Sequence, residues 1–171
     1  PHTSQKTMLV EVLHFKQKEI QMLDKRDVIK ATGKVSVVVT GPDGKVKEER
    51  YVDNLVVDSG LDFIAERMKD AVTTAMSHME VGTDATAADA GDTTLGAAVG
   101  SSRTALTSTT VTSNAVEYVC TFGAGVGTGA LVEAGIFNAG AAGDMLCRTT
   151  FSVVNKAAAD SMTINWTVTI S

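Results

Sequence analysis

The clearest hydrophobic pattern lies near the end of the chain, where apolar and polar residues alternate without a break. The apolar positions are Met162, Ile164, Trp166, Val168 and Ile170. In an extended strand these side chains all point to one face, so the pattern predicts a half-buried strand. The polar positions between them are Thr and Asn without any charge, which suits contact with another protein surface. We therefore expect the five apolar residues to form either the core or an oligomer interface.

Similar short segments, separated by turn-forming residues, predict further strands along the chain. They cover residues 34–40, 46–52, 79–81, 103–107, 111–122, 131–138 and 145–154. Gly41-Pro42-Asp43-Gly44 provides the dihedral angles of a tight turn, so the first two strands should form a hairpin. The last three strands of the chain, with only short breaks between them, predict an antiparallel meander.

One helix is expected at about residues 59–75. Ser59 followed by Asp62 resembles a capping box that opens it. The apolar face of this helix contains Leu61, Ile64, Ala65, Met68 and Val72. Because eight or so short strands cannot all bury their apolar sides in one open sheet, the sequence predicts two packed layers. The expected fold class is mainly β: an antiparallel β-sandwich or jelly-roll-like domain with one packed helix and an N-terminal arm.

The first part of the chain differs from the rest, so we divide the chain into a docking arm at 1–31 and a β-sandwich domain at 32–171. A partial helical stripe in the arm consists of Leu9, Val12, Leu13, Ile20 and Leu23. This stripe is too small to order the arm alone, because each fixed residue costs about 1–2 kcal/mol of backbone entropy. We expect its five side chains to bind a partner.

Composition excludes several function classes. The 171 residues suit one domain with an appendage, and the net charge is −5. The lysines of residues 16–30 are interleaved with acidic residues, so we expect no nucleic-acid partner. No stretch of 18 apolar residues exists and no secretion signal is recognisable, so we expect a soluble protein made in a cytoplasm, without a membrane partner.

A glycine-rich segment, Gly123–Gly129, follows a predicted strand and invites comparison with phosphate-binding loops. Such loops need a following helix whose N-terminus holds the phosphates, and residues 131–138 read as extended. The Lys and Ser/Thr pair of a Walker loop is also missing. We interpret the segment as a hairpin loop.

Asp84, Asp89 and Asp92 lie in a predicted long surface loop, residues 82–100. Three carboxylates in a loop can bind calcium, but the spacing does not match the calcium-loop pattern. The sequence leaves this question open, and we predict no metal site.

Cys120 and Cys147 each lie in a strand pattern and are expected to be buried, while their pairing stays open. The histidines are His2, His14 and His78, and no two of them have the spacing of a zinc motif. No nucleophile motif lies in its required strand–turn–helix context. We predict no catalytic or cofactor-binding residue and no enzymatic activity.

The order of turn and strand motifs resembles that of small structural proteins of tailed-bacteriophage virions. The motifs are Thr32-Gly33-Lys34-Val35, Gly41-Pro42-Asp43-Gly44, Val52-Asp53-Asn54-Leu55-Val56-Val57-Asp58-Ser59-Gly60-Leu61, Gly82-Thr83-Asp84, Asp92-Thr93-Thr94-Leu95, Glu133-Ala134-Gly135-Ile136-Phe137-Asn138, Gly143-Asp144-Met145-Leu146 and Ile164-Asn165-Trp166-Thr167-Val168. The resemblance spans residues 32–171 and leaves out the arm. It implies a virion structural protein, either a capsid decoration (cement) protein or a tail or fibre-attachment protein.

From this resemblance we expect a decoration protein that binds and stabilises the outer capsid surface, with the capsid favoured over the tail. Its expected partners are the major capsid protein or another virion structural protein, and a second copy of itself in a homotrimer. The alternative is a tail, baseplate or fibre-adaptor protein. A weaker alternative is a carbohydrate-binding module that uses Trp166 or the 82–100 loop.

Overall fold

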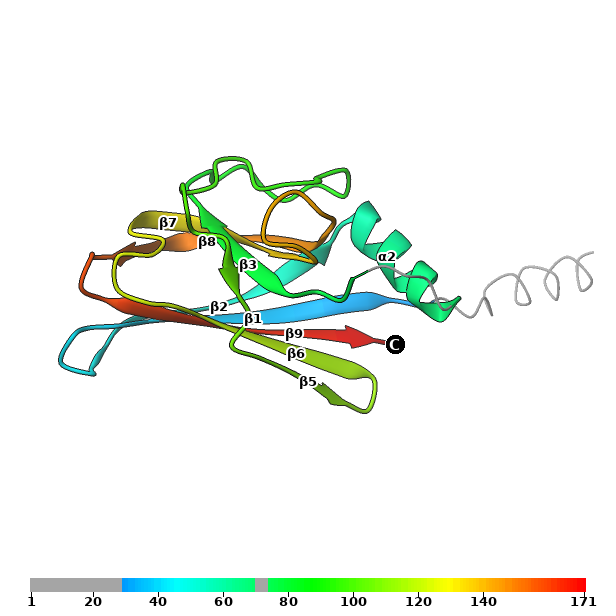
Figure 1. Cartoon of the computed structure of the whole chain (residues 1–171), viewed down its shortest axis with the longest axis horizontal. Coiled ribbons are helices and arrows are strands. Elements are labelled where there is room, and N and C mark those ends of the chain that lie inside the picture. The colour runs from blue at the N-terminus through cyan, green and yellow to red at the C-terminus, as the bar shows by residue number, and fades with distance from the viewer. Residues whose placement is uncertain (1–28, 70–73) are drawn as a thin grey trace, which may run out of the picture.

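The computed structural model describes residues 29–69 and 74–171, which form a mainly β domain with one helix (Figure 1). Its elements are β1 Ala31–Thr40, β2 Val46–Val56, α2 Asp58–Met68, β3 His78–Gly82, β4 Thr104–Ala105, β5 Ser108–Thr112, β6 Ala115–Phe122, β7 Gly129–Phe137, β8 Met145–Lys156 and β9 Ser161–Ile170. The predicted fold class is confirmed: mainly β, antiparallel, with a packed helix.

All nine strands belong to one antiparallel sheet with the order β4-β3-β7-β8-β2-β1-β9-β6-β5. The sheet curls, so that β3, β7 and β8 lie in a layer over β1, β9 and β6 (Figure 1). Strand β2 joins the two layers, because its residues 46–54 pair with β1 whereas Leu55 and Val56 pair with β8. The two packed layers expected from the sequence are thus two halves of one sheet.

The hydrophobic core lies between these two halves. Buried side chains of β1, β6 and β9 pack against those of β3, β7 and β8 in one cluster. The apolar residues of β9 belong to this cluster: Met162, Ile164, Trp166 and Val168 are buried, and Ile170 is half-buried at the end of the strand. The alternation of β9 therefore supplies the core of a single chain.

One hairpin was predicted from the sequence, and the structure contains it together with a second one that was not predicted. The β1–β2 hairpin is confirmed, with Thr40 opposite Val46 around the expected turn. The segment predicted as one strand at 111–122 is instead part of a second hairpin, β5–β6, whose turn includes Ser113 in the left-handed region at φ 55°. The alternation of Val116, Tyr118, Cys120 and Phe122 begins only after this turn.

The predicted C-terminal meander is wrong in its last step. Strands β7 and β8 pair as expected, but β9 pairs with β1 and β6 instead of β8. Residues 157–160 carry the chain from one half of the sheet to the other. The Gly123–Gly129 segment makes a similar crossing, since β6 and β7 do not pair, so it is not a hairpin loop. An extended strand follows it, which removes the helix that a phosphate loop needs.

Helix α2 packs on β8, with Phe63 buried in the core. The predicted capping box is wrong, because the helix begins after Val57 and the Ser59 hydroxyl donates to the Met145 carbonyl at 2.9 Å. Gly60 allows the close approach, since a Cβ there would lie 2.1 Å from the Leu146 carbonyl oxygen. The helix therefore begins where tertiary contacts hold it.

Several predicted features lie outside the described residues. They include the arm residues Leu9, Val12, Leu13, Ile20 and Leu23, together with Val72 of the predicted helix face. Among the described residues, the first strand of the domain, β1, begins at Ala31.

Candidate functional site

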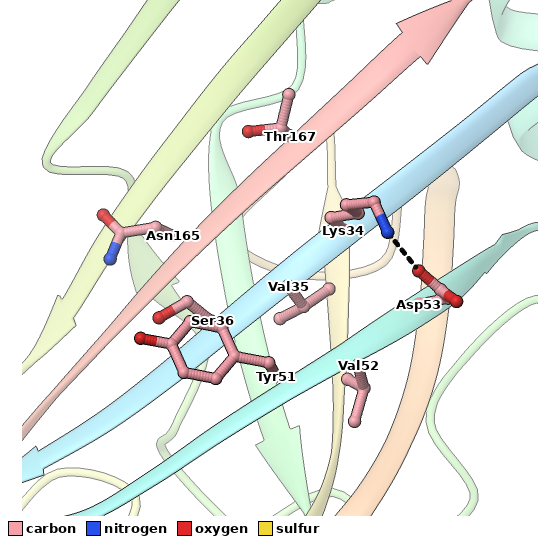
Figure 2. Close-up of a pocket in the computed structure, with 8 residues that line it drawn as sticks. All are labelled: Lys34, Val35, Ser36, Tyr51, Val52, Asp53, Asn165 and Thr167. Carbon is pink, nitrogen blue, oxygen red and sulfur yellow. Dashed lines mark hydrogen bonds and ion pairs between the residues drawn. The ribbon is translucent and has the colours of Figure 1, made fainter.

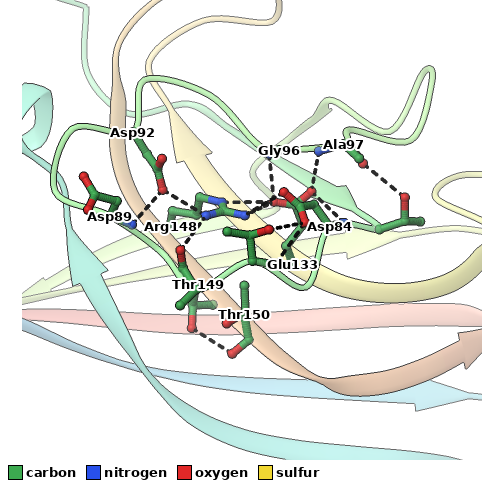
Figure 3. Close-up of polar contacts among 12 residues, drawn as sticks. Asp84, Asp89, Asp92, Gly96, Ala97, Glu133, Arg148, Thr149 and Thr150 are labelled. Carbon is green, nitrogen blue, oxygen red and sulfur yellow. Dashed lines mark hydrogen bonds and ion pairs between the residues drawn. The ribbon is translucent and has the colours of Figure 1, made fainter.

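A buried ion pair between Glu133 of β7 and Arg148 of β8 organises one side of the domain (Figure 3). A register shift between Leu131 and Glu133 in the β7–β8 pair explains how a carboxylate comes to lie there. Leu131 and Ala134 face the core, and this β-bulge turns Glu133 to the opposite side. Both side chains then lie beneath the 82–100 loop.

The Glu133 carboxylate has no solvent exposure and accepts hydrogen bonds from two sources. Arg148 donates from Nε at 3.0 Å and from Nη2 at 2.8 Å. The loop donates three backbone N–H groups, from Asp84, Gly96 and Ala97, at 3.2, 3.0 and 2.8 Å. A single buried carboxylate thus holds both ends of the loop.

Arg148 completes this network on its other side by donating from Nη1 to Asp92 at 2.9 Å, with Asp84 3.8 Å from Nη2. Burial alone would lower the pKa of Arg148, but the hydrogen bonds and charges of Glu133 and Asp92 outweigh it and raise this pKa. The guanidinium therefore stays charged. We call Glu133, Arg148, Asp84 and Asp92 the loop clamp.

Asp84, Asp89 and Asp92 of the 82–100 loop all accept hydrogen bonds from protein groups. Asp92 binds Arg148, Asp84 accepts from the Thr86 N–H and hydroxyl, and Asp89 accepts from the Gly91 N–H. Among residues 29–69 and 74–171, no group of three or more His, Cys, Asp or Glu side chains is placed to hold a metal ion. The hydrogen bonds of the three aspartates help to shape the loop.

A second buried polar cluster ties the two crossings between the sheet halves together. Lys156 is 1% exposed and donates to the Gly123 carbonyl and to the Asp160 carbonyl, both at 2.8 Å. The Asp160 carboxylate accepts from Lys47 at 2.7 Å and from the Ala157 N–H at 3.0 Å. The hydrogen bond from Lys47 lowers the pKa of Asp160, and the Ala157 bond and the Lys156 charge act in the same direction against desolvation.

We expect Asp160→Asn to destabilise the domain at pH 7 and to matter less in acid. Because the pKa of Asp160 is lowered in the folded state, its contribution is present above the unfolded value of about 3.9 and is lost as the pH falls through the folded value. Urea unfolding at pH 7 and pH 3 measures this difference. An equal loss of stability at both pH values would contradict the prediction.

The two cysteines are buried and free. Desolvation raises the pKa of Cys120 to about 12, and it also raises the pKa of Cys147. Neither thiol is therefore activated as a nucleophile. His78 contacts the Ser77 hydroxyl at 2.8 Å, while His2 and His14 lie outside the described residues.

An apolar groove of about 460 Å³ opens between α2 and the ends of β5, β6 and β9. Its floor consists of core side chains: Phe63, Met76, Tyr118, Leu146 and Val168. Its rim includes Met68 and Val111, which are 76% and 70% exposed. The described part of the chain begins at this end of the domain, because Lys30 and Ser171 exchange two backbone hydrogen bonds beside Ile170 of the groove.

A polar depression of about 390 Å³ lies on the outer face of β2, β1 and β9, away from the core (Figure 2). Its polar side chains are Lys34, Ser36, Tyr51, Asp53, Asn165 and Thr167. Alternation along β1 and β9 places these groups on the face opposite to Val35 and Trp166. The sequence predicted the uncharged polar positions of β9 but did not single out Tyr51.

The predicted sugar-binding residues are not placed for that role. Trp166 is fully buried, so its ring has no face for a ligand, and the 82–100 loop contains no aromatic side chain. The loop clamp was also not anticipated. Its signal was a charge inside each of two apolar runs, Glu133 after Leu131-Val132 and Arg148 after Met145-Leu146-Cys147.

Comparisons with other proteins give no family for this chain. No family model matches it, and neither a curated protein nor a solved structure does. Within the described residues, every helix is too short or too polar to cross a membrane.

Proposed function

We propose that this chain is a non-enzymatic structural protein of a tailed-bacteriophage virion, which binds and stabilises the outer capsid surface as a decoration (cement) protein. The motif resemblance over residues 32–171 supports the virion role. The apolar groove carries the proposal, because it gives the domain a surface suited to docking.

Soluble proteins rarely expose a continuous apolar patch unless it binds something. Here the core itself forms the floor of the groove, and the rim side chains Met68 and Val111 extend into solvent. Ile29, 66% exposed, marks the point where residues 1–28 join the domain next to the groove. The groove and the point where residues 1–28 join the domain therefore lie at the same end of the domain.

We assign one occupant to this surface, an apolar patch of the assembled capsid. The groove contacts it together with Leu9, Val12, Leu13, Ile20 and Leu23 of the N-terminal segment. A capsid is rigid and repeats its sites, so modest contacts suffice when several of them act through effective concentration. A homotrimer fits this role, since it matches the local threefold positions of an icosahedral shell.

The buried charged groups support a structural role over a catalytic one. Glu133 and Arg148 hold the 82–100 loop, while Lys156 and Asp160 hold the crossings between the sheet halves. Each of these side chains is engaged with protein groups in the folded domain.

Gold labelling of purified virions with an antibody against the full chain tests the proposal. We expect label spread over the capsid, with antibody pre-absorbed on the pure protein as the control. Label confined to the tail or to one vertex would favour a fibre-adaptor role instead. Absence of the chain from purified virions would overturn the virion role.

A further inference from the structure

Tyr51 is an exposed aromatic residue that lines the polar depression. It is 71% exposed, and its ring lies across β1 beside Ser36 (Figure 2). Its hydroxyl donates to Glu49 Oε1 at 2.5 Å, which restrains the ring. A restrained ring with a free face is a platform on which an apolar ligand surface can stack.

Strand register arranges hydrogen-bonding groups around this ring in two rows. Ser36 is opposite both Tyr51 and Asn165, and in the adjoining row Lys34 is opposite both Asp53 and Thr167. Neighbouring strands lie about 4.8 Å apart, so a ligand on the ring can contact groups from all three strands. The strands, rather than a mobile loop, fix this arrangement.

The chemistry of these groups suits hydroxyl-bearing ligands. Lys34 donates, Asp53 accepts, and Ser36, Asn165 and Thr167 each do both. Within the part of the chain that the structure describes, no hydrogen bond occupies the side chain of Asn165 or Thr167. A sugar has an apolar C–H face, which can stack on the Tyr51 ring. It also has hydroxyls that both donate and accept, which can bond to the polar side chains of the two rows.

Charge narrows the ligand class further. Glu49 and Asp53 flank the ring, and the chain carries a net charge of −5, so phosphates and anionic sugars are disfavoured. We propose that the outer face of β2, β1 and β9 binds a neutral hexopyranose unit of a glycan, with Tyr51 as the stacking platform. The site is separate from the apolar groove and does not depend on the proposed capsid role.

Native affinity electrophoresis of the full chain tests this site, in gels that contain dextran, mannan, galactomannan or xyloglucan. We expect at least one of these neutral polysaccharides to retard the protein. Tyr51→Ala should weaken this binding at least about tenfold, whereas Tyr51→Phe keeps the ring and should stay within about threefold. Asn165→Ala should lose about threefold to tenfold, since it removes one polar contact. Thr110→Ala, on the same face but outside the depression, is the matched control.

Circular dichroism establishes that each variant is folded, which is expected because Tyr51 and Asn165 lie outside the core. Retardation by none of the four polysaccharides would overturn the proposal. So would binding that Tyr51→Ala leaves unchanged, or retardation by polygalacturonate alone. Each result is independent of where the protein lies on a virion.

Discussion

Replacing Arg148 with alanine is expected to lower the free energy of unfolding by about 3–5 kcal/mol, because the buried Glu133 carboxylate loses its counter-charge. Domains of this size are typically stable by only about 5–15 kcal/mol, so the variant should be close to unfolding at 37 °C. The 82–100 loop should also become sensitive to thermolysin, since Arg148 no longer holds Asp92. Urea unfolding and limited proteolysis measure the two effects.

Lys34→Ala is the matched control, because Lys34 and Asp53 form an ion pair at 3.1 Å that is almost fully exposed. Its loss should cost less than about 1 kcal/mol. The double variant Glu133→Leu/Arg148→Met should not recover the wild-type stability, since the backbone N–H groups of Asp84, Gly96 and Ala97 would lose their acceptor. Similar losses for Arg148→Ala and Lys34→Ala would contradict a stabilising clamp.

The second large effect concerns the apolar groove. Met68→Asp/Val111→Asp is expected to weaken binding to purified capsids at least about a hundredfold, because each buried side chain contributes about 1.5 kcal/mol or more. Both residues are mostly exposed in the domain, so its melting temperature should stay nearly unchanged. Cosedimentation with capsids that lack the protein measures the binding.

Val46→Asp is the control for this experiment, since Val46 is also exposed but does not line the groove. It begins β2 just after the β1–β2 turn, and this turn lies at the opposite end of the domain from α2 (Figure 1). Full binding by the groove variant would contradict docking through this surface.

Deleting residues 1–28 tests whether the capsid or this N-terminal segment occupies the groove. We expect unchanged melting and much weaker capsid binding, whereas a lower melting temperature would mean that the segment covers its own groove.

The sequence was sufficient to predict strands but insufficient to predict which of them pair. The alternation around Trp166 correctly predicted one buried face, because side-chain direction in a strand is a local property. Pairing depends on contacts between distant segments. The short break at residues 157–160 favoured a β8–β9 hairpin, yet Lys156 and Asp160 hold this segment as a crossing.

The candidate sites show the same division between local and distant information. The Thr and Asn positions of β9 predicted a polar outer face, but the depression also needs Tyr51, which only strand register brings opposite Ser36. The sequence left a calcium site at the three loop aspartates open, since no local pattern indicates that Arg148 lies beside Asp84 and Asp92. A β-bulge, which alternation cannot anticipate, places Glu133 at the centre of that cluster.

The pairing of β1 with β9 has a consequence for folding during synthesis. Ala31 lies opposite Ile170, so the first strand of the domain needs the last one as its neighbour. Until the C-terminal residues leave the ribosome, the β1–β2 hairpin presents a long unpaired edge rich in valine, which invites pairing with other chains. Such distant contacts also slow folding. When many copies are synthesised at once, the unfinished chains should therefore be prone to aggregate until β9 pairs with β1.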